Sequence, residues 1–288
     1  MCTVRSRIRS LGLLLVLLLA AACNTARSDT LISQNTKVMK GFTAAWNDLD
    51  PDNLLSFYAK DVKSLDATAY GMVFSYTMIS DVLHSIASSH AFAVSLPYFF
   101  VSEDGRHAAA VGTFSELQLS GEYEPVPYVS LIEIDQGKIV WVFDYYGGVV
   151  SSLYPPQEIP ASANLLASRE SIKAARTALS GWESAYNDRD SKSFVSFYAD
   201  GADGYQVIGP EWRQLSKSTF SQDLGVKFSS QDFTSKLADF FISADGNFAA
   251  VQGTYGDAEI SERPMVVILE LKGGKIIQEY DYMAFLGK

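Results

Sequence analysis

One stretch of the sequence occurs twice, and this duplication limits what the chain can fold into more than any other feature. Residues 44–61 read AAWNDLDPDNLLSFYAKD, and residues 184–201 read SAYNDRDSKSFVSFYADG. Both copies carry an aromatic residue, then Asn-Asp-x-Asp and, about six residues later, Ser-Phe-Tyr-Ala. A chain of 288 residues is long enough for two domains of average size. The sequence therefore predicts one fold that is repeated, each copy with its own core.

The first copy begins with helices and continues with strands. Apolar residues recur at the 3.6-residue period of an amphipathic helix over residues 31–49. Asp50-Pro51 then marks the start of a shorter helix, because Asp is a good N-cap and Pro is tolerated in the first turn. A third helix is expected at 78–88, followed by strands at about 91–102, 106–119, 127–134 and 138–147. Helices followed by an antiparallel sheet predict an α+β domain.

The second copy repeats this order of elements. Helices are expected at 168–187, 191–199 and 216–228, before strands at about 233–243, 247–260, 264–271 and 275–285. Between the copies, residues 149–167 contain Pro155-Pro156 and many small residues, which is typical of a linker. We therefore expect domain 1 at 31–148, a linker at 149–167 and domain 2 at 168–288.

The first 22 residues have the pattern of an export signal. Arg5, Arg7 and Arg9 precede an apolar run at 11–19 that is too short to span a bilayer comfortably. The run ends in Leu-Ala-Ala-Ala-Cys at Cys23, which resembles the bacterial lipobox, whose cysteine is acylated and becomes the first residue after cleavage. This predicts a signal peptide at 1–22 and a lipidated tether at 23–30. The alternative is an ordinary signal peptide with a cysteine there by coincidence.

A lipidated Cys23 would anchor the protein in the cell envelope, on the extracytoplasmic side of a membrane. Because Asn24 follows the cysteine instead of Asp, the lipoprotein sorting rule directs the chain to the outer membrane in a two-membrane cell. In a one-membrane cell it would lie on the cell exterior. Cys2 lies in the segment to be removed, so no thiol would remain for a disulfide, a metal site or a nucleophile.

The chain is acidic, with a formal net charge of −10. Cleavage would remove three arginines and no acidic residue, leaving 20 basic against 33 acidic residues. Binding to nucleic acid requires clustered Lys and Arg that displace counterions from phosphates, and the sequence has no basic stripe. We therefore expect no nucleic-acid partner.

The repeated features together resemble the NTF2-like superfamily and, within it, the SnoaL-like branch. They are a long helix ending in Trp46-Asn47-Asp48, a short helix ending in Phe57-Tyr58-Ala59, and a last strand that begins with Gly-Lys-Ile and carries an Asp between aromatic residues. The resemblance implies two tandem cone-shaped domains, each with about three helices packed in a curved antiparallel sheet around a mostly apolar cavity. Members often pair across their sheets, so we expect a monomer in which the two domains form an intramolecular pseudo-dimer.

The resemblance also suggests candidate catalytic residues in domain 1, namely Asp66, His84 and Asp144. Asp66 falls at the position of the base in enolising isomerases of this fold, and Asp144 lies near the acid-base aspartate of polyketide-cyclase relatives. His84, in the third helix, would complete an Asp-His pair like that of some dehydratase relatives. The alternative for each residue is a structural or solvent-exposed role. The other two histidines, His90 and His107, end that helix and open a strand.

Other positions argue against the isomerase mechanism. The tyrosine donor of that family corresponds to Phe42, which cannot donate a hydrogen bond, and its acidic donor corresponds to about Ser130. The same three positions of domain 2, including that of the base, read Trp182, about Val267 and Gln206, and domain 2 has no histidine. Any chemistry is therefore expected in domain 1 alone.

Abundant aromatic residues would make any cavity apolar. The pocket candidates are Phe42, Trp46, Tyr58, Trp182, Tyr198 and Asp281. Asp281 is the counterpart of Asp144, and alternation along a strand does not show which face either aspartate occupies. The acidic pairs of the repeated stretch, Asp48 with Asp50 and Asp188 with Asp190, are interpreted as helix caps. No spacing suggests a metal site, and no cofactor is expected.

These observations support different functions as hypotheses. The first is a lipid-anchored extracytoplasmic protein whose domains bind a small apolar ligand or an envelope protein without catalysis. The second is an isomerase, dehydratase or cyclase-like enzyme with its active site in domain 1 only, which requires Asp66, His84 and Asp144 to converge on one cavity. A third is a purely structural envelope lipoprotein, which would have no pocket.

Overall fold

The computed structural model describes residues 29–66, 72–89, 91–117, 123–146, 169–208, 211–256 and 262–283. The predicted signal peptide, Cys23, His90 and the predicted linker lie outside the described residues. Within the described ranges, no helix is both long enough and apolar enough to cross a bilayer.

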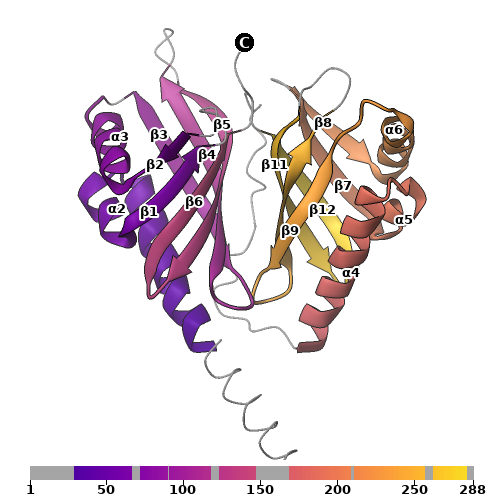
Figure 1. The fold of residues 1–288 in the computed structure, drawn as a ribbon, viewed down its shortest axis with the longest axis horizontal. Helices are drawn as coiled ribbons and strands as arrows, with labels where there is room; N and C mark the ends of the chain where they lie inside the picture. Colours follow the sequence, from indigo (N-terminus) through magenta and orange to yellow (C-terminus); the bar gives the residue numbers. More distant parts are fainter. Residues whose placement is uncertain are drawn as a thin grey trace, which may run out of the picture.

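Each domain combines helices with one six-stranded sheet (Figure 1). Domain 1 contains a helix at residues 29–47, α2 (Pro51–Phe57), β1 (Tyr58–Asp66), β2 (Met72–Phe74), α3 (Tyr76–Ser89), β3 (Phe92–Val101), β4 (His107–Leu117), β5 (Tyr123–Asp135) and β6 (Lys138–Tyr146). Its strand order is β2-β1-β6-β5-β4-β3.

Domain 2 has the same elements in the same order. They are α4 (Arg169–Asn187), α5 (Ser191–Ser196), β7 (Tyr198–Ile208), β8 (Glu211–Ser216), α6 (Lys217–Ser229), β9 (Lys236–Ile242), β10 (Phe248–Tyr255), β11 (Arg263–Lys272) and β12 (Lys275–Met283). The strand order is β8-β7-β12-β11-β10-β9, which matches domain 1 strand for strand. The structure thus confirms the α+β class and the tandem repeat of one fold.

The sheets also contain an arrangement that hydrophobic periodicity does not predict. In domain 1, β1 begins directly after α2 and runs parallel to β6, and β2 pairs antiparallel with its outer edge. The remaining strand pairs of the sheet are antiparallel, as expected. The parallel register places Asp66 beside Asp144 on neighbouring strands. Each sheet is therefore mixed, with one parallel pair inside it.

The repeated stretch builds the junction between helix and sheet. The Asp50 side chain accepts a hydrogen bond from the Asn53 backbone N–H at 3.1 Å, so it caps α2, and Asp190 caps α5 in the same way. The amide oxygen of Asn47 accepts from the Leu96 backbone N–H at 2.7 Å. Its counterpart Asn187 bonds to both backbone groups of Leu237 in β9. The motif is thus a folding signature that ties the long helix to the edge strand of each sheet.

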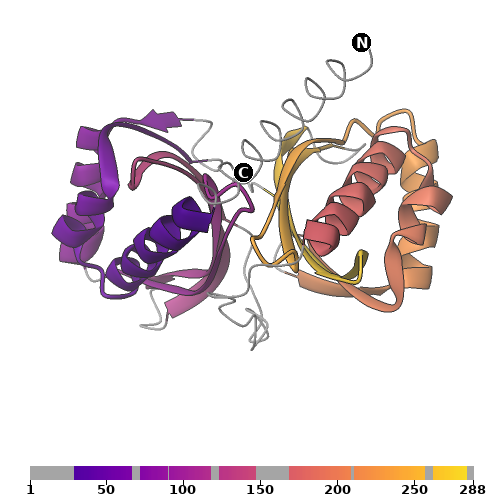
Figure 2. The same ribbon diagram turned by 90° about the horizontal axis from the view of Figure 1, so that it is seen from below.

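Each sheet bends around its long helix, as Figure 2 shows from below. A glycine allows this bend in both copies. A Cβ on Gly112 would lie 1.8 Å from the backbone oxygen of Ser95, and a Cβ on Gly253 would lie 2.3 Å from that of Lys236. Both positions adjoin a shift in strand register. A side chain there would push the edge strand away, because backbone atoms cannot move aside as a flexible side chain can.

The outer faces of the two sheets pack against each other between the helical layers (Figure 1). The Glu103 N–H donates to the Ile242 oxygen and the Ala244 N–H donates to the Val101 oxygen, both at 2.8 Å. Glu103 corresponds to Ala244 in the other domain, and Val101 corresponds to Ile242. Each bond is therefore the counterpart of the other, and the domains are related by a pseudo-two-fold axis. Buried apolar residues from both domains surround it: Phe100, Ala109, Val111, Val129, Leu131, Tyr145, Phe248, Ala250, Val266, Ile268, Tyr280 and Tyr282. We call this set the interdomain core.

Candidate functional site

Domain 1 contains a cavity of about 330 Å³ between its helices and its sheet. Its lining is mostly apolar, with two carboxylates: Trp46, Tyr58, Ser64, Asp66, Phe74, Ile79, Val82, Leu83, Ile86, Phe114 and Asp144. The residues at 29–47, β1, β2, α3, β4 and β6 therefore all contribute. The volume suits a small organic molecule.

Asp144 faces this cavity because side chains alternate along β6. Its neighbours Phe143 and Tyr145 point to the opposite side, where they pack on the interdomain core. Across the strand pair, Ser130 of β5 lies opposite Asp144. The Tyr128 hydroxyl donates to Asp144 Oδ1 at 2.7 Å, and the Ser130 hydroxyl also donates to this oxygen. One carboxylate oxygen is thus held by two hydroxyl groups.

The electrostatic surroundings of Asp144 favour its protonated form. Removal from water raises the pKa of Asp144 to about 6, against the opposing effect of hydrogen bonds from Ser130 and Tyr128. The nearby charge of Asp66 contributes to this rise. A carboxyl group with a pKa near neutrality can accept or donate a proton under ordinary conditions, which is the property required of an acid-base group.

The three predicted pocket residues of domain 1 lie together but play different parts. Trp46 and Tyr58 line the cavity. Phe42 is fully buried behind them, and its ring packs edge-on against Tyr58 with centroids 5.8 Å apart. Burial and the charge of Asp144 raise the pKa of Tyr58 well above its ordinary value. Tyr58 is therefore a neutral phenol beside the carboxyl group.

The structure separates His84 from the two aspartates. Its ring lies on the outer side of α3, with half of the side chain exposed, and its Nε2 atom lies 3.4 Å from Asp52 Oδ1. Its Nδ1 atom is 2.8 Å from the backbone oxygen of Ser80. Positions 79, 83 and 86 of α3 face the cavity instead. The Asp-His pair expected from the resemblance is therefore not formed with either Asp66 or Asp144.

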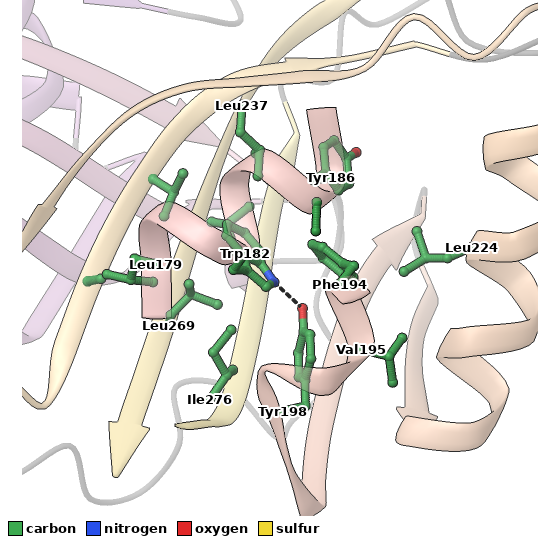
Figure 3. Close-up of a cluster of buried hydrophobic side chains, with 14 of the residues drawn as sticks. Leu179, Trp182, Tyr186, Phe194, Val195, Tyr198, Leu224, Leu237, Leu269 and Ile276 are labelled. Atoms are coloured by element: carbon green, nitrogen blue, oxygen red, sulfur yellow. Dashed lines mark hydrogen bonds between the residues drawn. The ribbon is translucent and has the colours of Figure 1, made fainter. Parts of the chain in front are cut away.

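In domain 2 the three predicted pocket residues, Trp182, Tyr198 and Asp281, belong to a buried polar chain, and Figure 3 shows the bond between Trp182 and Tyr198. The Trp182 Nε1–H donates to the Tyr198 hydroxyl at 2.9 Å, and this hydroxyl donates to Glu279 Oε2. Glu279 is only 4% exposed and lies two residues before Asp281, on the same inner face of β12. Phe42 and Val142 occupy the places of Trp182 and Glu279 in domain 1. At these equivalent buried positions, domain 2 is thus more polar than domain 1.

Aromatic residues fill much of the interior of domain 2 near the cavity's equivalent position. Phe228 stands where domain 1 has Ala87, and Tyr255 stands where it has Phe114. Tyr186 packs edge-on against Phe228 and Phe233, with centroids 5.4 and 5.9 Å apart. Lys227, in the place of Ile86, donates to the Tyr255 hydroxyl at 2.7 Å. Tyr255 and Lys227 therefore bond to each other at positions whose domain 1 counterparts, Phe114 and Ile86, line the cavity.

Glu279 and Asp281 form a pair of neighbouring acids on the inner face of β12. Loss of hydration raises the pKa of Glu279 well above its ordinary value, and the neighbouring charge of Asp281 adds to this effect. Burial raises the pKa of Asp281 to about 6. Asp281 Oδ1 has no hydrogen-bond partner among the described residues. Two ionised carboxylates that are shielded from water repel each other strongly. The folded state therefore favours a protonated form of one of the two acids.

Sequence reasoning identified Asp66 and Asp144 but missed Tyr128 and Glu279. Tyr128 precedes Ser130 by two residues, so the alternation of β5 places both hydroxyl groups on one face. Glu279 precedes Asp281 by the same spacing on β12. In each case the missed residue lies two positions before a residue that sequence reasoning had already named. The two-residue period of a strand was the signal that could have identified it.

A metal centre finds no support in the described ranges. No group of three His, Cys, Asp or Glu side chains is placed there to bind an ion. Asp66 and Asp144 are two carboxylates, fewer than the four protein ligands of a structural zinc site.

The chain was compared with known proteins. No protein-family model matches it, and no curated protein matches it. Among solved structures, a proposed polyketide cyclase from Xanthomonas campestris pv. campestris is 18% identical, with 92% of its length and 40% of this chain covered and a TM-score of 0.35. A second proposed polyketide cyclase, from Pseudomonas putida KT2440, is 21% identical, with 90% and 39% covered and a TM-score of 0.34.

A third similar structure is an NTF2-like protein of unknown function from Burkholderia pseudomallei K96243. It is 15% identical, with 90% of its length and 39% of this chain covered and a TM-score of 0.34. Each of these proteins spans about one domain of this chain. The chain has two α+β domains of the same topology in tandem, as the strand order of each sheet and its enclosed helices show.

Proposed function

We propose that this chain is a lipid-anchored extracytoplasmic binding protein, and that the cavity of domain 1 takes a small, mostly apolar molecule that carries one hydrogen-bond donor. The observation that carries the proposal is the placement of Asp144, beside Asp66, at a mostly apolar cavity of about 330 Å³. Apolar side chains supply burial of the ligand's surface, and one polar group fixes its orientation. The anchor at Cys23 predicts incorporation of labelled palmitate, which should be absent after Cys23→Ser.

Hydrogen-bond geometry explains the expected preference for a donor. Oδ1 of Asp144 already accepts from Tyr128 and Ser130. Ser64 also forms a hydrogen bond with this carboxylate. The two carboxylate oxygens offer about four acceptor positions, so Asp144 can still accept from a ligand hydroxyl or amine. A ligand without a donor would forgo this hydrogen bond to the carboxylate, a loss of about 1.5–3 kcal/mol. An alcohol or phenol should therefore bind more tightly than its ether.

The test uses 2-naphthol as a probe and 2-methoxynaphthalene as the matched ligand without a donor. By isothermal titration calorimetry, 2-naphthol should bind with a dissociation constant on the order of 10–100 µM, as expected for a ligand of this size. The methoxy compound should bind about tenfold more weakly, in line with the loss of one hydrogen bond.

Two tryptophan substitutions locate the site. Ile86→Trp places a large ring in the cavity and should weaken binding of 2-naphthol at least tenfold. Val226→Trp adds the same ring on α6, where the native side chain is 73% exposed, and should leave binding unchanged. Equal affinity in Ile86→Trp and in the unchanged protein would exclude the cavity as the binding site.

A second candidate function is proton abstraction next to a carbonyl group, and the raised pKa of Asp144 favours it. The base must be ionised, so the rate should rise with pH and reach half its maximum near the pKa of about 6. The probe is 2-tetralone in deuterated water, with exchange of its α-protons followed by NMR. Asp144→Asn should abolish the protein-dependent rate. If the unchanged protein exchanges these protons no faster than this variant, domain 1 is a binding domain only.

A further inference from the structure

A second hollow, unrelated to the domain 1 cavity, lies between the two sheets. This groove has a volume of about 420 Å³ and is lined by residues of both domains. Six of them determine its chemistry: Glu133, Trp141, Phe143, Asp239, Phe240 and Phe241. Trp141 and Phe143 lie on β6 and the other two aromatic residues on β9, so the groove exists only because the two domains pack together.

The aromatic residues form the walls of the groove. The rings of Trp141 and Phe143 are nearly parallel, with centroids 5.6 Å apart. All four aromatic side chains are partly exposed, in contrast to the buried residues of the interdomain core. The guanidinium of Arg176 already lies 5.8 Å from the centre of the Phe240 ring. This contact shows that a ring of the groove can receive a cation on its face.

The groove carries more negative than positive charge. Arg176 is paired with Glu103 across the domains. His107 Nδ1 lies 3.6 Å from Asp104 Oδ1, and the interaction with this carboxylate raises the pKa of His107. Arg176 and His107 are the positive groups that line the groove, so each of them is already paired with an acidic side chain.

Glu133 and Asp239 remain as the surplus acids. Both are exposed, and neither forms an ion pair with the residues that the structure describes. Both are close enough to raise the pKa of His107 through their charge. The rim of the groove therefore attracts a positive charge, while its walls offer aromatic faces.

The pseudo-two-fold axis provides an internal comparison. On its other side, Phe248 stands in the place of His107 and packs on Phe100 with centroids 5.8 Å apart. Gln278 stands in the place of Trp141, and Ala244 in that of Glu103. Phe248 is 3% exposed, whereas the His107 side chain is 42% exposed. The imidazole of His107, the indole of Trp141 and the carboxylate of Glu103 therefore have no like residue at the equivalent positions on the other side.

We propose that this interdomain groove binds a small organic ammonium ion. The alkyl groups of such an ion would pack on Trp141 and the Phe240–Phe241 walls, and the carboxylates of Glu133 and Asp239 would balance its charge. Aromatic walls favour alkylated ammonium ions because a bare metal ion or ammonium would lose more hydration on contact with the rings. This site is independent of the ligand proposed for domain 1.

The test compares choline with its neutral carbon isostere, 3,3-dimethyl-1-butanol, by NMR chemical-shift titration of the whole protein. The two molecules have the same shape, so any difference in affinity reports the positive charge. Choline should bind with a dissociation constant on the order of 1 mM, as expected for a ligand of about seven heavy atoms. The neutral isostere should bind at least tenfold more weakly.

Substitutions test which residues are responsible. Trp141→Ala should weaken choline binding at least fivefold, and the double substitution Glu133→Gln with Asp239→Asn should weaken it about tenfold. Glu270→Gln alters the pseudo-symmetric counterpart of Glu133 and should leave the affinity unchanged, as should Ile86→Trp in the domain 1 cavity. Equal affinity for choline and the neutral isostere would overturn the proposal, and so would an equal loss in Glu270→Gln and the double variant.

Discussion

Ala250→Glu is expected to separate the two domains while leaving each sheet folded. Ala250 is fully buried in the interdomain core, on the outer face of β10. A carboxylate there would lose its hydration without gaining a cation, at a cost of about 3–5 kcal/mol. The interior of domain 2 lies on the opposite face of the sheet and should be unaffected. Small-angle X-ray scattering should show a larger radius of gyration, and chemical unfolding should change from one transition to two.

Val226→Glu is the matched control, since it introduces the same charge on an exposed position of α6. It should change neither the radius of gyration nor the shape of the unfolding curve. Light scattering on the unchanged protein tests the accompanying prediction of a monomeric chain. If Ala250→Glu keeps a compact shape and unfolds in one transition, the interdomain core is not what unites the domains.

Glu279→Gln is expected to stabilise the protein at neutral and alkaline pH. The pKa values of Glu279 and Asp281 are raised in the folded state, so the folded protein binds more protons than the unfolded chain above about pH 4. The free energy of unfolding should therefore fall as the pH rises from the unfolded to the folded pKa values, by about 1.4 kcal/mol per pH unit for each group. A glutamine keeps an acceptor for the Tyr198 hydroxyl and carries no charge. The variant should thus lose much of this pH dependence.

The measurement is chemical denaturation at pH 5, 7 and 9. The difference in the free energy of unfolding between Glu279→Gln and the unchanged protein should grow from pH 5 to pH 9. Glu170→Gln, on the exposed first turn of α4, removes a carboxylate without changing a buried pair and should follow the unchanged protein. If the free energy of unfolding changes with pH in the same way for Glu279→Gln and the unchanged protein, the acid pair does not hold a proton in the folded state.

Much of the fold could be predicted because its signals are local. Asp50 and Asp190 were recognisable as N-caps, and a cap depends on residues within one turn of helix. The hairpin turns at Gly105 and Gly246 were equally clear, since positive φ angles of 74° and 71° favour glycine. The two copies also supported each other, because each signal appeared twice at nearly the same spacing. Domain order and most elements followed from these signals.

The parallel pairing of β1 with β6 was not predictable in this way. It joins residues far apart in the chain, such as Asp66 and Asp144, through the closure of the whole domain. Nothing in the local pattern of β1 distinguishes a parallel from an antiparallel neighbour. The pairing matters for function because it brings the two candidate acids together, whereas helix packing turns His84 away from them.

The prediction of a lipobox, the repeat and the α+β order of elements came from the sequence by itself, because each can be recognised from short stretches of residues. A bulge in the β5–β6 hairpin shows what the tertiary structure decided. Regular pairing from Asp135 and Lys138 would put Ser130 opposite Phe143, but the register shifts by one residue after Ile134 and Ile139. This shift places Ser130 opposite Asp144, where its hydroxyl can bond to the carboxylate. Side chains alternate between faces, so one extra residue determines which groups line the cavity and which face the neighbouring domain.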